Sequence, residues 1–472
     1  MFNLIDDPWI SVLTKDGEKK LGLLDIFKEA DSIKAISGNA LDKIAITRLL
    51  VCISQAAIGV PKNKSEWEKC KSKIQKISTV YLKKWHDSFF LYGNKAFLQL
   101  PKMNIKTILT DKIIIEYASG NNHTVYDHNA GISRNYPESD LAMALLKTQL
   151  FSYGGRNGSV WDVQKSNSMS GALLNSTLVT LLLGEDILST IHLNMATMEI
   201  MEGIPVGKPV WEDIPNDPKC PKADILKKSY LGNLIPLTRG IKLMSENKSL
   251  VMYSDGISGY CPLYRDPMAS TYTDKKGGRH YRSVPLTKHV WKDLVSILSI
   301  KDIGDGQGAY TLNNIDISTP NFNLWVGGIA CDKSKIKDIV EWSYIIPSGC
   351  LESDQLRDYQ VEIDYASDVE KALRESLYEM GENKKSELIS TFWNQIENFS
   401  FGLFQKIIEC HANKNNNSDA WRDSWRRRCR AISINCFKNS YQTQTGGGIM
   451  NYAKGLRVLS KKLNKIGGKN DN

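Results

Sequence analysis

Histidines and paired carboxylates are the residues best suited to metal or acid–base chemistry, but their spacing here does not favour it. The seven histidines include no HExxH or HxH pattern. His123 and His128 stand five residues apart in a polar segment, which is poor spacing for two ligands on one helix face. Asp6 and Asp7 precede Pro8, which indicates a turn rather than a metal-binding pair. The sequence therefore predicts no metal site.

Glycine and cysteine motifs also give no sign of catalysis. The chain has no GxxxxGK[S/T] phosphate loop and no GxSxG nucleophile elbow. The glycines of 304–308 do not open a helix after a strand, so they indicate a surface turn. The nine cysteines form no CxxC pair, which favours reduced thiols over a zinc or redox site. We therefore expect a protein without enzymatic activity and without a cofactor.

Arginines near the C-terminus have spacing suited to a polyanion. Residues 411–472 hold 13 Lys and Arg against 3 Asp and Glu, which concentrates the net charge of +9 in this region. In the segment 421–432, two tryptophans fall on one side of a predicted helix, beside a basic stripe. The stripe consists of Arg422, Arg426 and Arg430, and Arg427 adds to its charge. We predict contacts with a DNA backbone, and a merely solvated basic face is the alternative.

Hydrophobic periodicity predicts the elements that position these residues. Helical patterns cover residues 41–60, 64–90, 138–151 and 172–200. Residues 205–345 mix short strands and turns with a basic loop at 271–292. From about residue 350 the pattern is helical, with breaks at 413–417 and 446–448. We predict an α+β protein with a large mixed domain over 1–348 and a basic helical bundle over 349–472.

The apolar content excludes a membrane protein. No stretch of about 18 apolar residues occurs, so no transmembrane helix is expected. The first residues lack the basic and apolar regions of a secretory signal. We expect a cytoplasmic protein.

An ordered set of short segments resembles one known family. The segments are Asn3–Ile10, Leu23–Phe27, Arg48–Ile53, Ala96–Gln99, Ser119–Gly120 and Tyr153–Gly155. Together they resemble CasA, the large subunit of the type I-E CRISPR surveillance complex Cascade, over roughly the first 350 residues. The C-terminal part matches only in its helical-bundle character, which in that family is a four-helix bundle.

The resemblance implies a binding subunit without catalysis. Its partners would be CRISPR RNA, the other Cascade subunits and double-stranded target DNA. Guide RNA reads the target by base pairing, while the protein reads a short flanking motif, the PAM. The subunit also helps open the duplex for R-loop formation and provides a docking surface for a helicase-nuclease effector.

The resemblance assigns PAM reading to a glycine loop. The candidate residues are Gly154, Gly155, Arg156 and Asn157. Backbone without Cβ atoms approaches the minor groove closely, and an arginine adds charge there. An ordinary turn after the helix at 138–151 is the alternative.

A second segment, Gly327–Ile336, resembles the hairpin that separates the first base pair. Asp332 and Lys333 fall at its tip, where the family can carry an amide. Lys333 or Lys335 would hold a phosphate of the opened strand. A plain β-turn is the alternative.

Two further sets of residues follow from the resemblance. Loop 119–136 is similar to a loop that contacts the guide RNA and neighbouring subunits. Its candidate residues are Asn122, His123, Tyr126 and His128. The candidates for a basic PAM contact are Arg265, Lys275 and Lys276.

Two other functions stay open at this point. One is a nucleic-acid enzyme with an unfamiliar metal site, and the other is a scaffold that only joins other subunits. The resemblance favours the DNA-recognising subunit over both.

Overall fold

The computed structural model describes two compact units of an α+β protein. The described residues are 1–117, 127, 131–157, 167–169, 171–201, 203–216, 220–257, 264–285, 290–300, 306–332, 335–382, 385–412, 418–440 and 446–467. The first unit comprises Met1–Leu286, Gly308–Asp316 and Phe322–Ile346, and the second Thr287–Gln307, Ile317–Asn321 and Pro347–Asn472. The second unit thus includes two segments that the sequence division at residue 348 had placed in the large domain.

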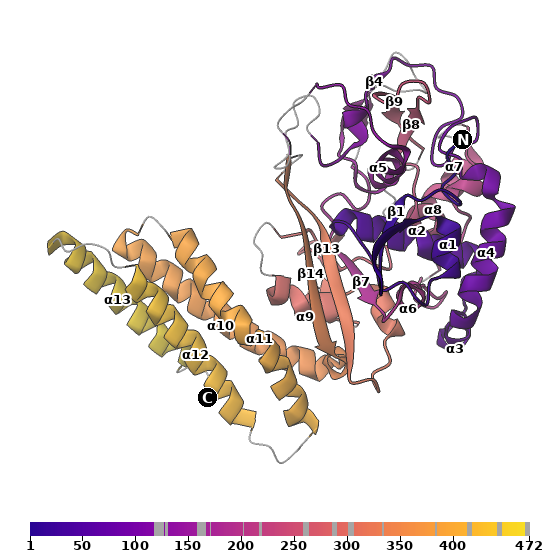
Figure 1. Ribbon diagram of the computed structural model, residues 1–472. Helices are drawn as coiled ribbons and strands as arrows, with labels where there is room; N and C mark the ends of the chain where they lie inside the picture. The colour runs from indigo at the N-terminus through magenta and orange to yellow at the C-terminus, as the bar shows by residue number, and fades with distance from the viewer. Residues whose placement is uncertain are drawn as a thin grey trace. The chain divides into compact units, whose positions relative to one another are not determined.

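The first unit surrounds helix α2 (Ala40–Ile58) with short helices and small sheets (Figure 1). Its other helices are α1 (Leu23–Lys28), α3 (Lys64–Glu68), α4 (Ile74–Lys84), α5 (Glu138–Phe151), α6 (Ile187–Leu193), α7 (Pro221–Lys228) and α8 (Tyr230–Leu234). Helix α2 is buried from Ala40 to Gln55 except at Asp42 and Lys43. It is a central helix because its apolar residues are not confined to one stripe. A capping box between Asn39 and Asp42 fixes where it begins.

Small sheets and hairpins complete the first unit. Its strands are β1 (Ile10–Thr14), β2 (Gly17–Leu21), β3 (Ala35–Ile36), β4 (Ile108–Leu109), β5 (Gly155–Asn157), β6 (Asn167–Met169), β7 (Val179–Leu183), β8 (Arg239–Leu243), β9 (Leu250–Asp255), β10 (Thr271–Thr273), β11 (Arg279–Tyr281), β13 (Asn321–Asp332) and β14 (Lys335–Pro347). Three of the sheets have the orders β2-β1-β3, β4-β9-β8 and β14-β13-β7, while β5 pairs with β6 and β10 with β11. The long strands β13 and β14 form a hairpin around positions 333–334 (Figure 1).

The predicted helices at 41–60 and 138–151 are confirmed by α2 and α5. The predicted helix at 64–90 is interrupted, because a 3-10 turn separates α3 from α4. The predicted helix at 172–200 is wrong, since this segment contains strand β7 and only the short helix α6. Gly184 separates the two, where a Cβ atom would lie 2.3 Å from Ser189 Cβ. The apolar run that suggested a helix is a fully covered strand, which lacks alternating polarity.

The second unit contains the helical bundle. Its helices are α9 (Leu294–Leu298), α10 (Ser353–Met380), α11 (Lys385–Ala412), α12 (Ser418–Asn439) and α13 (Gly446–Gly467), and its strand is β12 (Gly306–Gln307). Helix α10 packs against α11, α12 and α13. The break predicted at 446–448 is misplaced, because these glycines form the first turn of α13. Among the described helices, none is long and apolar enough to cross a membrane.

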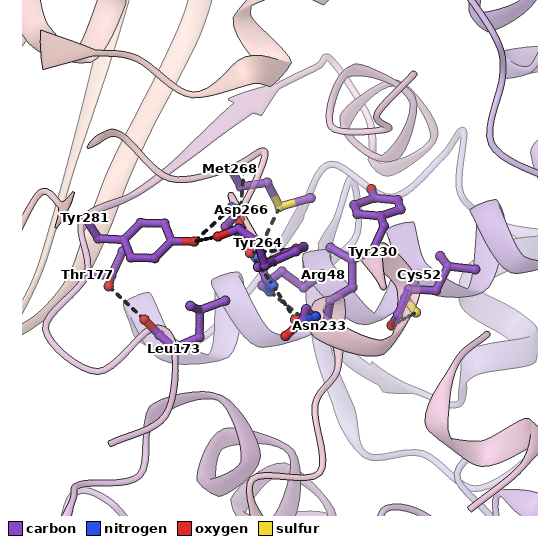
Figure 2. A network of polar contacts seen from close by, with 12 residues as sticks. Arg48, Cys52, Leu173, Thr177, Tyr230, Asn233, Tyr264, Asp266, Met268 and Tyr281 are labelled. Atoms are coloured by element: carbon purple, nitrogen blue, oxygen red, sulfur yellow. Dashed lines mark hydrogen bonds and ion pairs between the residues drawn. The ribbon is translucent and has the colours of Figure 1, made fainter. Parts of the chain in front are cut away.

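A buried ion pair connects α2 to the polypeptide that leads into β10 (Figure 2). Arg48 and Asp266 have no exposed surface, and Arg48 Nη2 lies 2.7 Å from Asp266 Oδ2. The guanidinium also donates to the carbonyl oxygens of Asn233 and Leu234 at 3.1 Å each. Burial opposes the charge of Arg48, but attraction and hydrogen bonding to Asp266 hold its pKa above the ordinary value. The pair therefore fixes three segments that are distant in sequence.

Two further bonds of Asp266 extend this network toward β11. Its carboxylate accepts from the Met268 backbone N–H at 2.9 Å. Its own backbone N–H donates to the Tyr281 hydroxyl at 3.1 Å, and that hydroxyl donates to the Tyr264 carbonyl at 3.0 Å. The segment 264–268 is thereby held at both ends.

Replacing Arg48 with Met should destabilise the first unit by about 3–5 kcal/mol, because Asp266 would stay buried without its cation. The double variant Arg48→Met/Asp266→Asn should lose less than the sum of the single losses, by about 0.5–3 kcal/mol. Chemical denaturation measures both quantities. Lys28→Met, which removes a cation of an exposed pair, is the control and should cost less than about 1 kcal/mol. Simple additivity of the two buried substitutions would contradict this account.

Candidate nucleic-acid interface

The segment Gly171–Leu183, here named the junction segment, forms backbone hydrogen bonds with the protein segments from which three candidate DNA-contacting elements extend. Toward the glycine loop, the backbone N–H of Ala172 donates to the Ser152 carbonyl at 2.8 Å. Toward the basic hairpin β10–β11, Leu178 donates to the Arg282 carbonyl at 2.8 Å. Its C-terminal half is β7, which pairs with β13 of the long hairpin. One continuous segment of the chain therefore sets the positions of all three elements.

The glycine loop is held at Tyr153. The carbonyl of Tyr153 accepts from Arg239 Nη2 at 2.6 Å, and its hydroxyl accepts from the Cys331 thiol at 3.6 Å. Burial, followed by the neighbouring Cys331, raises the pKa of the Tyr153 hydroxyl, which keeps it neutral. Cys331 belongs to β13, so this contact joins the loop directly to the long hairpin.

Beyond Tyr153 the chain becomes accessible. Gly154 is partly buried and Gly155 is exposed, and a Cβ atom built on Gly155 meets nothing within 4 Å. Arg156 and Asn157 pair through β5 with Ser168 and Asn167 of β6, while their side chains lie outside the described residues. The exposed backbone at Gly155 is the feature that the glycine-loop hypothesis requires.

The long hairpin projects past its sheet. Strand β13 pairs with β7 from Asn323 to Gly327, and residues Gly328–Asp332 continue beyond this pairing. Gly328 lies where β13 stops pairing with β7, and it has a φ angle of +151°. A Cβ atom there would approach the Thr177 carbonyl oxygen to 2.7 Å and Val284 to 2.8 Å. Only glycine fits this crossing without strain.

The tip of this hairpin is only partly described. The backbone of Asp332 ends β13, and Lys335 begins β14 with an exposed side chain. Lys333 and the side chain of Asp332 lie outside the described residues. The strands on either side of the tip therefore pair as a hairpin, as expected, while its role in strand separation and its tip chemistry stay predictions.

The basic hairpin presents Lys275 and Lys276 at an exposed turn. The Asp274 carboxylate accepts from the backbone N–H groups of Lys276 and Gly278, each at 2.8 Å. His280 also bonds this carboxylate at 2.9 Å and is the main reason that the pKa of Asp274 is lowered. The acidic residue thus shapes the turn, while the two lysines remain exposed.

Arg265 is not available for a base contact. Its side chain is 6% exposed, and its guanidinium lies over the Tyr310 ring at 3.7 Å. It donates to the Tyr310 hydroxyl at 2.6 Å and to the Gly308 carbonyl at 3.2 Å. The prediction for Arg265 is therefore corrected, because the cation fixes residues 308–310 instead of facing solvent.

The predicted arginine stripe of the bundle is also corrected. Arg422 pairs with Asp358 at 2.9 Å, and Arg426 pairs at 2.8 Å with Glu362, which is fully buried. The hydrogen bonds that Arg426 donates to the Glu362 carboxylate are the main cause of the raised pKa of Arg426. Arginines four residues apart on α12 match carboxylates four residues apart on α10, which the sequence did not reveal.

The other two arginines of the stripe differ from each other. Arg430 donates to the Leu463 carbonyl of α13, which ties the helices together. Arg427 is exposed, and among the described residues its side chain bonds within its own helix, at the Asp423 carbonyl. Of the four predicted arginines, Arg427 alone keeps the exposure that a phosphate contact needs.

The proposed guide-contacting loop can be described only at its base. Asn122, His123, Tyr126 and His128 lie outside the described residues. Arg134 bonds both Asp111 and Asp127 at 3.2 Å, and its guanidinium lies 4.7 Å from the Tyr117 ring centre. Arg134 thereby connects the described residues at the two ends of this loop.

Among the described residues, no group of three or more His, Cys, Asp or Glu side chains is placed so that it could bind a metal ion. The described cysteines are free thiols. Burial raises the pKa of the Cys436 thiol to about 11 and also raises that of Cys52. Neither thiol is activated as a nucleophile.

One known family matches most of the chain. The family model of the CRISPR-associated protein Cse1 matches residues 3–436. The chain belongs to the Cse1 family. A CasA/Cse1 protein of Thermus thermophilus is 24% identical over an alignment of 506 positions, gaps included. The alignment covers 99% of this chain and 98% of that protein. The sequence resemblance to CasA is thereby confirmed, and the match extends into α12, beyond the first 350 residues.

Solved structures of this family share the fold. Thermus thermophilus CasA (Cse1) matches with a TM-score of 0.80 at 20% identity, over 98% of this chain and 99% of that one. A chain of a CRISPR RNA-guided surveillance complex matches with a TM-score of 0.77 at 15% identity, over 98% of this chain and 99% of that one. The Cse1 fold therefore extends through both units.

Gly328→Ala should destabilise the protein by about 1–3 kcal/mol, because alanine is strained at this φ angle and its Cβ atom meets the Thr177 carbonyl. Gly155→Ala is the matched control, since its Cβ atom enters open space. Thermal unfolding of both variants measures the difference. Equal shifts in Tm would show that the Gly328 crossing does not constrain the hairpin.

Proposed function

We propose that the protein is the DNA-recognising large subunit of a type I-E RNA-guided surveillance complex. It reads the PAM of a target duplex, helps separate the strands for R-loop formation and provides a docking surface for a helicase-nuclease. Its partners are CRISPR RNA and the other Cascade subunits, and it works in the cytoplasm. It contributes binding and strand separation, while the effector carries out catalysis.

The observation that carries this proposal is that all three elements are hydrogen-bonded to the same junction segment. The glycine loop, the long hairpin and the basic hairpin all bond to the junction segment, although they come from residues 150–157, 321–347 and 268–284. PAM reading and strand separation must occur on adjacent base pairs, so their elements need a fixed relation. Backbone hydrogen bonds to one segment supply that relation without depending on flexible side chains.

Each element has a distinct chemical task. At Gly155 the exposed backbone meets the minor groove, where base acceptors accept hydrogen bonds from N–H groups. The hairpin around 333–334 enters between the strands, with Lys335 near a phosphate. Lys275 and Lys276 bind phosphates and so position the duplex without reading its sequence. Arg427 is the remaining candidate for a backbone contact by the bundle.

Gly155→Asp should weaken binding of the reconstituted complex to a duplex with a correct flank by at least about tenfold, or 1.4 kcal/mol. The added carboxylate blocks the close approach and repels phosphates. Binding to DNA that is already open should change by less than about twofold, because pairing with the guide does not need the loop. Gly155→Ala controls for folding, and electrophoretic titration of the wild type and both variants measures the affinity for each DNA form. Equal losses on both DNA forms would favour a scaffold role.

Replacing Lys275 and Lys276 with serine should weaken duplex binding for every flanking sequence alike. The slope of log affinity against log salt should fall by about 1.8 if each lysine contacts one phosphate. Lys83→Ser/Lys84→Ser removes the same charge from exposed positions on α4 and serves as the matched control. An altered flank preference, or an unchanged salt slope, would contradict the phosphate assignment.

A further inference from the structure

One side-chain contact joins the glycine loop to the long hairpin at the point where both leave the core. The Cys331 thiol donates to the Tyr153 hydroxyl oxygen at 3.6 Å. On β13 the residues Leu324–Ala330 are buried, and Cys331 is partly exposed. In the loop, Ser152 is buried, Tyr153 is partly buried and Gly155 is exposed. The contact therefore lies at the boundary between the packed and the accessible parts of both elements.

The junction segment holds the long hairpin farther from its tip. Its pairing with β13 ends at Gly327, and β13 continues to Asp332. Gly327 and Cys331 are four residues apart, which corresponds to about 13 Å along an extended strand. Cys331, by contrast, directly precedes the last residue of β13. Tyr153 thus supports the hairpin much closer to its tip than the junction segment does.

The other end of this support is fixed to the core through Arg239. Its fully buried guanidinium donates to the Tyr153 carbonyl at 2.6 Å and to the Tyr253 hydroxyl at 3.0 Å. The side chain of Gln149 bonds both backbone groups of Arg239, at 2.8 and 2.9 Å. The ring of Tyr153 also packs against the hydrophobic core. Tyr153 is therefore held at its backbone and its ring, and its hydroxyl reaches the hairpin.

We propose that Tyr153 is a positioning residue for strand separation, which through Cys331 sets the hairpin tip in register with the flanking base pairs that the glycine loop reads. Gly155 is two residues from Tyr153, so the same residue supports the reader and the wedge. A side-chain contact near both ends fixes their spacing more closely than distant backbone bonds alone. The inference rests on the proposed function and deepens it, because it names the residue that relates PAM reading to opening.

Tyr153→Phe is a selective test of this contact. It removes the hydroxyl and keeps the ring that packs against the core, so the fold should persist. Tyr81→Phe is the matched control, because the buried Tyr81 hydroxyl donates to Glu212 at 2.6 Å and accepts from Trp211 at 2.9 Å. Those partners belong to neither DNA-contacting element. The control therefore loses buried hydrogen bonds without touching the loop or the hairpin.

The measurement is the rate at which the reconstituted complex opens a target duplex with a correct flank. A 2-aminopurine in the first target base pair reports opening by stopped-flow fluorescence. Tyr153→Phe should slow opening by about two- to fivefold, the lower part of the range for one hydrogen bond, because a thiol is a weak donor. A duplex whose first base pairs are mismatched should restore the wild-type rate, since the tip no longer has a pair to separate. Tyr81→Phe should lower Tm and leave the opening rate unchanged.

A double-mutant cycle tests whether Tyr153 acts through Cys331. Cys331→Ala should slow opening about as much as Tyr153→Phe, and the double variant should be no slower than either single variant. Single effects that multiply in the double variant would overturn the inference. An unchanged opening rate of Tyr153→Phe, or equal slowing on the mismatched duplex, would also overturn it. Equal slowing by Tyr81→Phe would assign the effect to general destabilisation and would likewise contradict the inference.

The wild-type complex tests the proposed function in the same experiment. Equal opening rates for correct and incorrect flanks would contradict PAM reading by this chain. A preserved flank preference together with a wild-type opening rate for Tyr153→Phe would overturn only the positioning role. The two failures are therefore distinguishable.

Discussion

The buried ion pair between Arg48 and Asp266 is the constraint on which the candidate interface depends. Two charges without solvent exposure require each other, since removing either leaves the other unpaired in a low-dielectric interior. The pair fixes the segment 264–268 against α2, the central helix of the first unit. That segment in turn accepts the Thr180 backbone N–H at the Met268 carbonyl, at 2.7 Å. Through this bond the core determines where the junction segment lies.

The junction segment explains how rigid and exposed parts coexist in one unit. Its residues are mostly buried, and its hydrogen bonds go to three separate chain segments. The elements that extend from these segments end in exposed groups, at Gly155, Lys335 and Lys275. In the proposed DNA-binding surface, the buried hydrogen bonds to the junction segment fix the positions of these elements, and their exposed ends are left accessible to DNA. Gly328 shows the same division, because its conformation is fixed by Thr177 and Val284 at the point where the hairpin leaves the sheet.

Sequence reasoning predicted the parts of the fold that have strong local signals. The apolar run of α2, the helix α5 and the helical C-terminal bundle follow from periodicity. The hairpin around 333–334 was expected from the family resemblance. The strand β7 was not predicted, because a strand covered on both faces has the same composition as a buried helix. A helix at 172–200 was expected there, and the junction segment was consequently missed.

Charged side chains were harder to predict, because their partners lie far away in sequence. Arg48 stands alone in an apolar run, a signal that could have indicated a buried ion pair, but Asp266 is 218 residues away. Arg422 and Arg426 have the spacing of a phosphate-binding stripe and also the spacing of Asp358 and Glu362 on a neighbouring helix. Arg265 is basic and close to the predicted PAM contacts, yet Tyr310 and Gly308 bind it. The glycine loop was assigned from the family resemblance, and the structure shows that Gly155 is exposed and that its Cβ position is open.

The central claim is that this chain gives the surveillance complex its preference for a flanking sequence. The most direct measurement is binding of the reconstituted complex to a library of duplexes with randomised flanks, with and without this chain, at one fixed salt concentration. The account predicts that a flank preference appears only when the chain is present, while pairing of the guide with opened DNA persists in its absence. A flank preference that is unchanged without the chain would contradict the account and leave it as an assembly scaffold.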